Sequence, residues 1–454
     1  MVIRQRMHRV LAFLLIGFFA VSCSLFDNDR KASVPFPCED GMADGYPCEN
    51  VDMFAHLSLY ELTGDSVDTR LNDIWGWTDP QTQKEYALVG YTTGVSFVDI
   101  SDPAQPLVVG RLPESNLRAK YKRLSFDQYP SCNLSIGNTE FSRSLTEGST
   151  WRDVKVYDNH AFVVSDAQPH GMQVFDLTKL RNYSGEVMTL EQDALYDRFG
   201  SAHNIVINEA TGYAYGVGIT QGEICGSRDS TGLHMVNIQN PKNPEFAGCY
   251  IDGSPGNYRI AKGYIHDAQC VIYDGPDTEY SGKEICFNSS EGNVVIADVS
   301  DKANPQTLGY KRQVDMQYSH QGWLTEDHSF FLMNDELDER NLGRETKTYV
   351  WDVRDLEDPK FIGYYSHETP SIDHNLYVKG QYAYETNYNA GLQILDLSGV
   401  ADAQLERIAY FDTQPQTDAP NFTGTWSNYP FYESGLVVLS DIETGLFVVR
   451  PNLD

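Results

Sequence analysis

One short strand pattern recurs six times along this chain: four or five mostly apolar residues, then an Asp or Asn, then a polar turn. The copies read GVSFVDISDPAQP from residue 94, GMQVFDLTKL from 171, GLHMVNIQNPKNP from 232, NVVIADVSDKANP from 293, KTYVWDVRDLEDP from 347 and GLQILDLSGV from 391. A strand this short cannot bury a hydrophobic core by itself, so the repeated units must stack on one another. The repeat therefore predicts one large body, although 454 residues would otherwise suggest two or three domains.

The unit is clearest between residues 372 and 411, where four strands are predicted. They span His374–Lys379, Tyr382–Asn387, Gly391–Leu397 and Leu405–Phe411, each rich in β-branched or aromatic residues and bounded by Gly, Asn or Asp. A fourth strand follows the repeated strand in most copies, and in the second copy it is obscured around Glu186–Leu190. Six four-stranded units are thus visible.

The two ends of the chain together supply a seventh unit. Three strands are predicted at Thr425–Phe431, Gly435–Asp441 and Gly445–Arg450, with no fourth strand after them. The segment Phe54–Leu62 near the amino terminus resembles a fourth strand and has no unit of its own. Pairing it with the last unit removes the exposed edges that a linear stack would leave. The predicted fold is an all-β, seven-bladed β-propeller whose last blade is closed by the amino-terminal strand.

Several longer blocks resemble a known family. A His-Asp or His-Asn start followed by the aliphatic strand resembles the LVIVD repeat. Blocks such as TWRDVKVYDNHAFVVSDAQPHGMQVFDL, GSAHNIVINEATGYAYGVG and HQGWLTEDHSFFLMNDELDE are similar to the choice-of-anchor B family of bacterial surface proteins. The resemblance runs from about Pro37 to Pro451. It implies a surface-displayed repeat domain and assigns no biochemical activity.

The first 22 residues read as a lipoprotein signal peptide. A basic start precedes the apolar run Val10–Val21, and small residues lead to Cys23, which resembles a lipobox with Cys23 as the lipidated residue. An ordinary secretory signal is the alternative. The predicted organisation is a signal peptide (1–22), a lipidated tether with a Cys38/Cys48 loop (23–50) and the propeller (51–454). We expect an exported protein anchored through its lipid in the bacterial envelope, at the outer membrane or cell surface.

Charge and cysteine content narrow the partners and the compartment. The formal charge of −30 argues against nucleic acids and anionic membrane surfaces as partners, since both need clustered Lys and Arg. Export permits disulfides among the seven cysteines other than Cys23. The pairs we expect are Cys38–Cys48, Cys225–Cys249 and Cys270–Cys286, the last on consecutive antiparallel strands. Cys132 is then left without an assigned partner.

The first strand of each propeller blade lines the central channel, so residues at equivalent positions converge there. The start of this strand in the seven blades is occupied by Asn72, Arg152, His203, His266, His320, His374 and Trp426. The next position carries Asp73, Asp153, Asn204, Asp267, Gln321, Asn375 and Ser427. The second-strand ends and following loops add Asp166, His170, Asn288, Asp335, Glu336, Asp338 and Asn387 to the same face.

Four successive blades therefore present histidine at one level, which accounts for four of only 11 histidines in the chain. Imidazole with carboxylate suits a divalent transition metal. The competing explanation is structural, because a repeat also duplicates residues that satisfy loop amides and join blades. The acidic loop 334–341 is a separate candidate for calcium, although it lacks the spacing of a calcium-binding loop.

The sequence leads to two functional hypotheses. The first is a monomeric binding module that holds a surface partner, a metal or a small polar ligand at its histidine-rich face. The alternative is a hydrolytic or oxidative metal-dependent enzyme with its ion among the four histidines and with Asp153 or Asp267 as base or supporting carboxylate. No GxSxG, HExxH, CxxC or GxGxxG-helix motif supports other enzyme classes.

Overall fold

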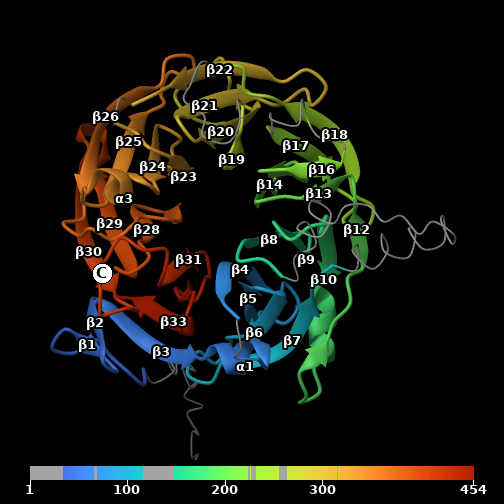
Figure 1. Cartoon of the computed structure of the whole chain (residues 1–454), viewed down its shortest axis with the longest axis vertical. Helices are drawn as coiled ribbons and strands as arrows, with labels where there is room; N and C mark the ends of the chain where they lie inside the picture. The colour runs from blue at the N-terminus through green and yellow to red at the C-terminus, as the bar shows by residue number, and fades with distance from the viewer. Residues whose placement is uncertain are drawn as a thin grey trace, which may run out of the picture. The chain divides into compact units, whose positions relative to one another are not determined.

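The computed structural model describes residues 34–65, 69–115, 148–222, 225, 232–254, 263–313 and 315–453. These residues form seven antiparallel sheets arranged as the blades of a β-propeller around a central channel (Figure 1). The predicted fold class is therefore confirmed. Cys23, Cys132 and the predicted signal peptide lie outside the described residues.

Each blade contains four antiparallel strands, with the first strand innermost in Figure 1. Blade 1 contains β4 (Leu71–Thr78), β5 (Glu85–Tyr91), β6 (Gly94–Asp99) and β7 (Leu107–Pro113). Blade 2 contains β8 (Arg152–Tyr157), β9 (His160–Ser165), β10 (Met172–Asp176) and β12 (Ala194–Tyr196). Blade 3 contains β14 (Asn204–Asn208), β15 (Tyr213–Val217), β17 (Leu233–Asn237) and β18 (Glu245–Tyr250).

The next three blades repeat this order. Blade 4 contains β19 (Asp267–Ile272), β20 (Glu284–Ser290), β21 (Asn293–Asp298) and β22 (Gln306–Lys311). Blade 5 contains β23 (Ser319–Leu324), β24 (Phe330–Asp335), β25 (Lys347–Asp352) and β26 (Lys360–Ser366). Blade 6 contains β27 (Leu376–Lys379), β28 (Tyr382–Thr386), β29 (Leu392–Gly399) and β30 (Gln404–Phe411).

Blade 7 joins the two ends of the chain. Its strands are β31 (Thr425–Tyr429), β32 (Val437–Asp441), β33 (Gly445–Pro451) and β3 (Val51–Leu57). The amino-terminal strand β3 runs antiparallel to β33, with Met53 opposite Val449 and Leu57 opposite Leu446. The ring is thus closed as predicted.

The predicted closing strand Phe54–Leu62 is wrong at its carboxyl end. The strand stops at Leu57, and a short helix, α1 (Leu59–Thr63), follows. Ser58 and Glu61 form a capping box at the start of this helix, because each side chain bonds the backbone amide of the other residue. The SLYE sequence carried this signal, which outweighed the apolar pattern of the segment.

The fourth strand of blade 2 is also displaced from its predicted place around Glu186–Leu190. Residues 188–189 instead form β11 (Met188–Thr189), which pairs in parallel with β7 at the outer edge of blade 1. The fourth strand of blade 2 is β12, which pairs with β10. A crossover to the neighbouring blade leaves no repeat signal in the sequence. Residues 199–201 and 220–222 form a further two-stranded ribbon, β13 (Phe199–Ser201) with β16 (Thr220–Gly222).

The recurring Asp or Asn of the sequence repeat makes a turn that ends the third strand. The side-chain oxygen accepts a hydrogen bond from the backbone amide two residues later, which is the geometry of an Asx turn. This bond forms from Asp99, Asp176, Asn237, Asp298, Asp352 and Asp396. The residue that identifies the repeat therefore redirects the chain toward the fourth strand.

Residues 34–50 belong to the same compact unit as the blades. Strand β2 (Tyr46–Glu49) pairs with β30, and β1 (Met42–Ala43) pairs with β2, which extends blade 6 to six strands. The part of the predicted tether from residue 34 to residue 50 thus packs on the propeller.

All three predicted disulfides are present: Cys38–Cys48, Cys225–Cys249 and Cys270–Cys286. Cys270 lies directly opposite Cys286 in the β19–β20 pairing, as the sequence register predicted. Such bonds indicate an extracellular or periplasmic protein. Within the described residues, no helix combines the length and apolar character needed to cross a membrane.

Candidate functional site

The structure brings the four predicted channel histidines into one continuous row. Each stands at the start of the innermost strand of its blade, in blades 3 to 6. The ring centres of His203 and His266 are 4.6 Å apart, those of His266 and His320 are 4.4 Å apart, and those of His320 and His374 are also 4.4 Å apart. Neighbouring blades therefore present imidazoles within contact distance of one another.

Bonds between blades orient two of these rings. Nδ1 of His266 lies 2.9 Å from the carbonyl oxygen of His320, and Nδ1 of His374 lies 2.6 Å from that of Trp426. A carbonyl oxygen can only accept, so Nδ1 carries the proton in both rings. In the neutral ring, Nε2 then keeps its lone pair and is available as a metal ligand.

Glu336 projects from the loop after β24 to this row. Its carboxylate oxygens lie 3.7 Å from Nε2 of His320 and 3.7 Å from Nε2 of His374. Tyr388, in the loop after β28, donates a hydrogen bond of 3.0 Å to the Glu336 carboxylate and so holds it in place. The phenol of Tyr388 was not identified from the sequence, although it follows the predicted residue Asn387.

Ligand atoms of His266, His320 and Glu336 lie within 4.8 Å of one another. Zinc bound tetrahedrally at 2.0–2.1 Å holds its ligand atoms about 3.3 Å apart, so a small inward rotation of these side chains would complete three ligands of such a site. Both histidines are almost fully buried. The ligand set and its separation are thus compatible with a transition-metal site.

Burial keeps these imidazoles neutral. Desolvation, reinforced by the neighbouring rings, lowers the pKa of His266 and of His320 well below the ordinary value, and desolvation lowers that of His374 to about 4. Burial raises the pKa of Glu336 to about 7, against the hydrogen bond from Tyr388. A metal does not have to displace a proton from the free nitrogen of a neutral imidazole, so these rings can bind a metal directly.

His203, at one end of the row, differs in the direction of its pKa shift. Burial lowers its pKa, but the carboxylate of Asp166, 3.0 Å away, outweighs this effect and raises the pKa overall. These two residues line a cavity of about 520 Å³ together with Trp151 and Tyr264. A space of this size beside the histidine row can hold a small ligand.

The remaining first-level residues make contacts between blades. Arg152 donates to the backbone carbonyl of Tyr91 and contacts Nε2 of His170 at 2.8 Å, while Asn72 donates to the carbonyl of Thr150. Trp426 packs edge-on against His374 at 4.7 Å. Arg152 and His170 therefore contact each other and are not part of the group formed by His266, His320 and Glu336.

Three other predicted residues act within their own blades or loops. Asn288 donates to the carbonyls of Cys286 and Val295, and Asn387 contacts the ring of His367 at 3.4 Å. The carboxylate of Asp335 accepts backbone amides from residues 317, 318 and 337. Among the described residues, the acidic loop with α3 (Asp338–Leu342) forms no group of three carboxylates as compact as the His266–His320–Glu336 group.

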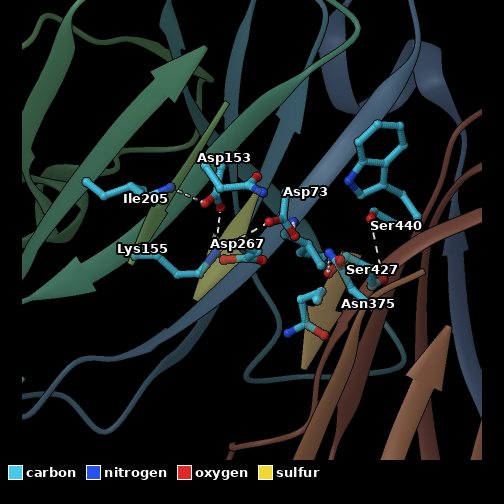
Figure 2. Close-up of polar contacts among 12 residues, drawn as sticks. Asp73, Asp153, Lys155, Ile205, Asp267, Asn375, Ser427 and Ser440 are labelled. Atoms are coloured by element: carbon cyan, nitrogen blue, oxygen red, sulfur yellow. Dashed lines mark hydrogen bonds and ion pairs between the residues drawn. The ribbon is translucent and has the colours of Figure 1, made fainter. Parts of the chain in front are cut away.

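The second level of the channel is a buried network centred on a residue that the sequence analysis missed. The Lys155 ammonium lies 2.5 Å from Asp153 and 3.3 Å from Asp73, and Figure 2 shows Asp267 beside them. Desolvation raises the pKa of Asp153, whereas at Asp73 the Lys155 charge and the hydrogen bonds together outweigh desolvation and lower the pKa. Lys155 occupies the fourth position of β8, two residues after Asp153. Strand alternation puts these two side chains on the same side of the strand, and this spacing could have identified Lys155 from the sequence.

Comparisons with known proteins find one repeat family and several similar structures. The LVIVD repeat model matches residues 83–113 and 374–405, in blades 1 and 6. The periplasmic gluconolactonase PpgL of Pseudomonas aeruginosa has a similar structure, with 10% identity over 82% of this chain and 87% of its own and a TM-score of 0.47. A protein from Lactobacillus plantarum has 11% identity over 82% of this chain and 89% of its own, with a TM-score of 0.48. No curated protein matches the chain.

Proposed function

We propose that this seven-bladed propeller, which carries LVIVD repeats, is a binding module of the bacterial envelope that holds a divalent transition metal at His266, His320 and Glu336. The observation that carries the proposal is the convergence of two neutral imidazoles and one carboxylate from adjacent blades within 4.8 Å. His374 is next in the row and lies 3.7 Å from the same carboxylate, so it is the candidate for the fourth ligand.

The surroundings of the three ligands favour a metal over a purely structural role. A structural histidine satisfies its ring with partners on both nitrogens. Here Nδ1 of His266 is bonded to the next blade, while the Nε2 atoms of His320 and His374 face a carboxylate at 3.7 Å, beyond hydrogen-bond length. A cation between these groups would shorten these approaches to bonding contacts.

The cavity beside His203 supports binding of a polar ligand next to the metal. It is lined by an imidazole, a carboxylate and the rings of Trp151 and Tyr264, which together offer hydrogen bonds and apolar contact. His266 joins this cavity to the metal-type ligands through ring contact with His203. A small polar ligand or a polar group of a surface partner would then bind beside the metal site, on the His203 side of the histidine row.

The test is zinc titration of the metal-stripped protein by calorimetry. We expect one site per chain, and we expect His320→Ala and Glu336→Gln each to weaken it at least about tenfold. His160→Ala is the control, because this imidazole lies at the β8–β9 turn, away from the start of the inner strand, and bonds the carbonyl of Asp158. Absence of stoichiometric zinc binding by the folded parent protein, or unchanged binding by both site variants, would overturn the proposal.

Placement in the envelope rests on the amino terminus and the disulfides. The lipobox-like sequence before Cys23 supports lipid anchoring in the manner of the choice-of-anchor B family, with retention at the outer membrane or surface. Expression of the full chain with radiolabelled palmitate should label the protein, and Cys23→Ala should abolish the label. Labelling of the Cys23→Ala variant would contradict anchoring through this residue.

A further inference from the structure

A second cavity lies farther along the channel than the histidine row. Its volume is about 570 Å³, within the range of small-molecule sites. The histidines stand at the first position of the inner strands, whereas this cavity is lined by later positions, such as Trp75 of β4, Gln269 of β19 and Trp323 of β23. The two sites therefore occupy different levels of the channel.

One wall of this cavity is aromatic and is built by four blades. Tyr377 packs edge-on against Trp75 at 5.7 Å and against Trp323 at 5.1 Å, and Tyr429 packs against Trp75 at 5.0 Å. Phe431 contacts this group at 5.4 Å from Tyr429. Because these rings support one another, they form a rigid wall whose electron-rich faces attract cations.

The bottom of the cavity is acidic. Lys155 and Asp267 both line it, and Asp73 and Asp153 lie against the Lys155 ammonium, so three carboxylates surround one cation (Figure 2). The carboxylate of Asp267 accepts the Ala268 amide at 2.7 Å, and among the described residues it has no ion pair with Lys or Arg. Lys155 is thus paired closely with Asp73 and Asp153, whereas Asp267 lines the cavity without such a close partner, and burial raises its pKa to about 7.

We propose that this cavity binds a small organic ammonium ion, with its charged group between Asp267 and the aromatic wall. Lys155 itself shows that a cation is accepted here, since its ammonium lies 4.6 Å from the centre of the Trp75 ring. An anionic ligand would meet the carboxylates of Asp267 and Glu209, which both line the cavity, whereas a cation would stabilise the ionised form of Asp267. The overall charge of −30 further favours a cationic ligand.

Choline and its neutral carbon isostere, 3,3-dimethylbutan-1-ol, provide the test, because they differ in charge and hardly in shape. Binding is measured on the full chain by calorimetry and by quenching of tryptophan fluorescence. We expect saturable binding of choline, and binding at least about tenfold weaker for the isostere, since a desolvated cation–π contact and a carboxylate contact together exceed about 1.4 kcal/mol. Equal affinity for the two compounds, or no saturable binding of choline, would overturn the proposal.

Variants place the ligand in this cavity. Asp267→Asn and Trp323→Leu should each weaken choline binding at least about tenfold. Asp358→Asn and Tyr364→Leu are controls, because both side chains are well exposed and lie away from the cavity. Near-ultraviolet circular dichroism establishes that each variant is folded. Unchanged choline binding in folded Asp267→Asn would overturn the proposal, and zinc titration of the same variant reports on the histidine site separately.

Discussion

Ring closure by the amino-terminal strand makes a quantitative prediction at Phe54. This side chain is 1% exposed and packs between blades 7 and 1, in a cluster with Leu57, Leu71 and Val448. Burial of a phenylalanine contributes about 1.5–3 kcal/mol, and the cavity left by its removal adds a further cost. We therefore expect Phe54→Ala to lower the free energy of unfolding by about 3–5 kcal/mol.

Phe246→Ala is the matched control, since Phe246 also lies on a fourth strand, β18 of blade 3, but is 42% exposed. Its substitution should change the free energy of unfolding by about 0.5 kcal/mol or less. Urea unfolding followed by tryptophan fluorescence measures both changes as shifts of the midpoint multiplied by the slope. If Phe54→Ala cost no more than Phe246→Ala, β3 would not be an integral part of the ring in solution.

Three further predictions concern other parts of the molecule. Burial and the neighbouring Arg152 guanidinium lower the pKa of His170 to about 3, so below pH 6.5 the unfolded chain binds a proton that the folded chain excludes. The free energy of unfolding should therefore fall as the pH drops from 6.5 toward 4. Thermal melting over this range should show a less steep fall for His170→Gln. Cys249→Ser opens the bond to Cys225 across 24 residues and should cost about 3 kcal/mol in urea unfolding, whereas an unchanged midpoint would show that the bond does not restrain the unfolded chain. Tyr388→Phe removes the hydrogen bond to Glu336 and should weaken zinc binding about 10–100-fold, while Tyr364→Phe, at an exposed position, should have no effect on the same titration.

The repeat made the architecture accessible from the sequence. Each Asp or Asn after the third strand bends the chain by a local hydrogen bond, so its spacing marks the blades directly. The disulfide between Cys270 and Cys286 followed from strand register for the same reason, because opposite residues in a hairpin are set by the turn. The alignment of inner strands also placed His203, His266, His320 and His374 at one level before any distance was known.

Two local strand predictions were wrong, at residues 59–63 and at residues 188–189. Residues 59–63 are apolar enough for a strand, but the Ser58–Glu61 capping box turned them into a helix. Residues 188–189 belong to the edge of blade 1 and not to blade 2, because edge pairing depends on which unpaired strand lies nearby in space.

The sequence alone determined the ring, its closure and the level of the histidines, because turn chemistry and strand register are local and repeat along the chain. Only the tertiary structure decided which side chains meet across the channel. It brought Glu336 between His320 and His374 and set Lys155 between Asp73 and Asp153. It also packed Trp75 of blade 1 against Tyr377 of blade 6. The contacts of Glu336 with His374, of Lys155 with Asp73 and of Trp75 with Tyr377 cross from one blade to another, and their geometry depends on how closely the blades pack, a quantity that no single repeat contains.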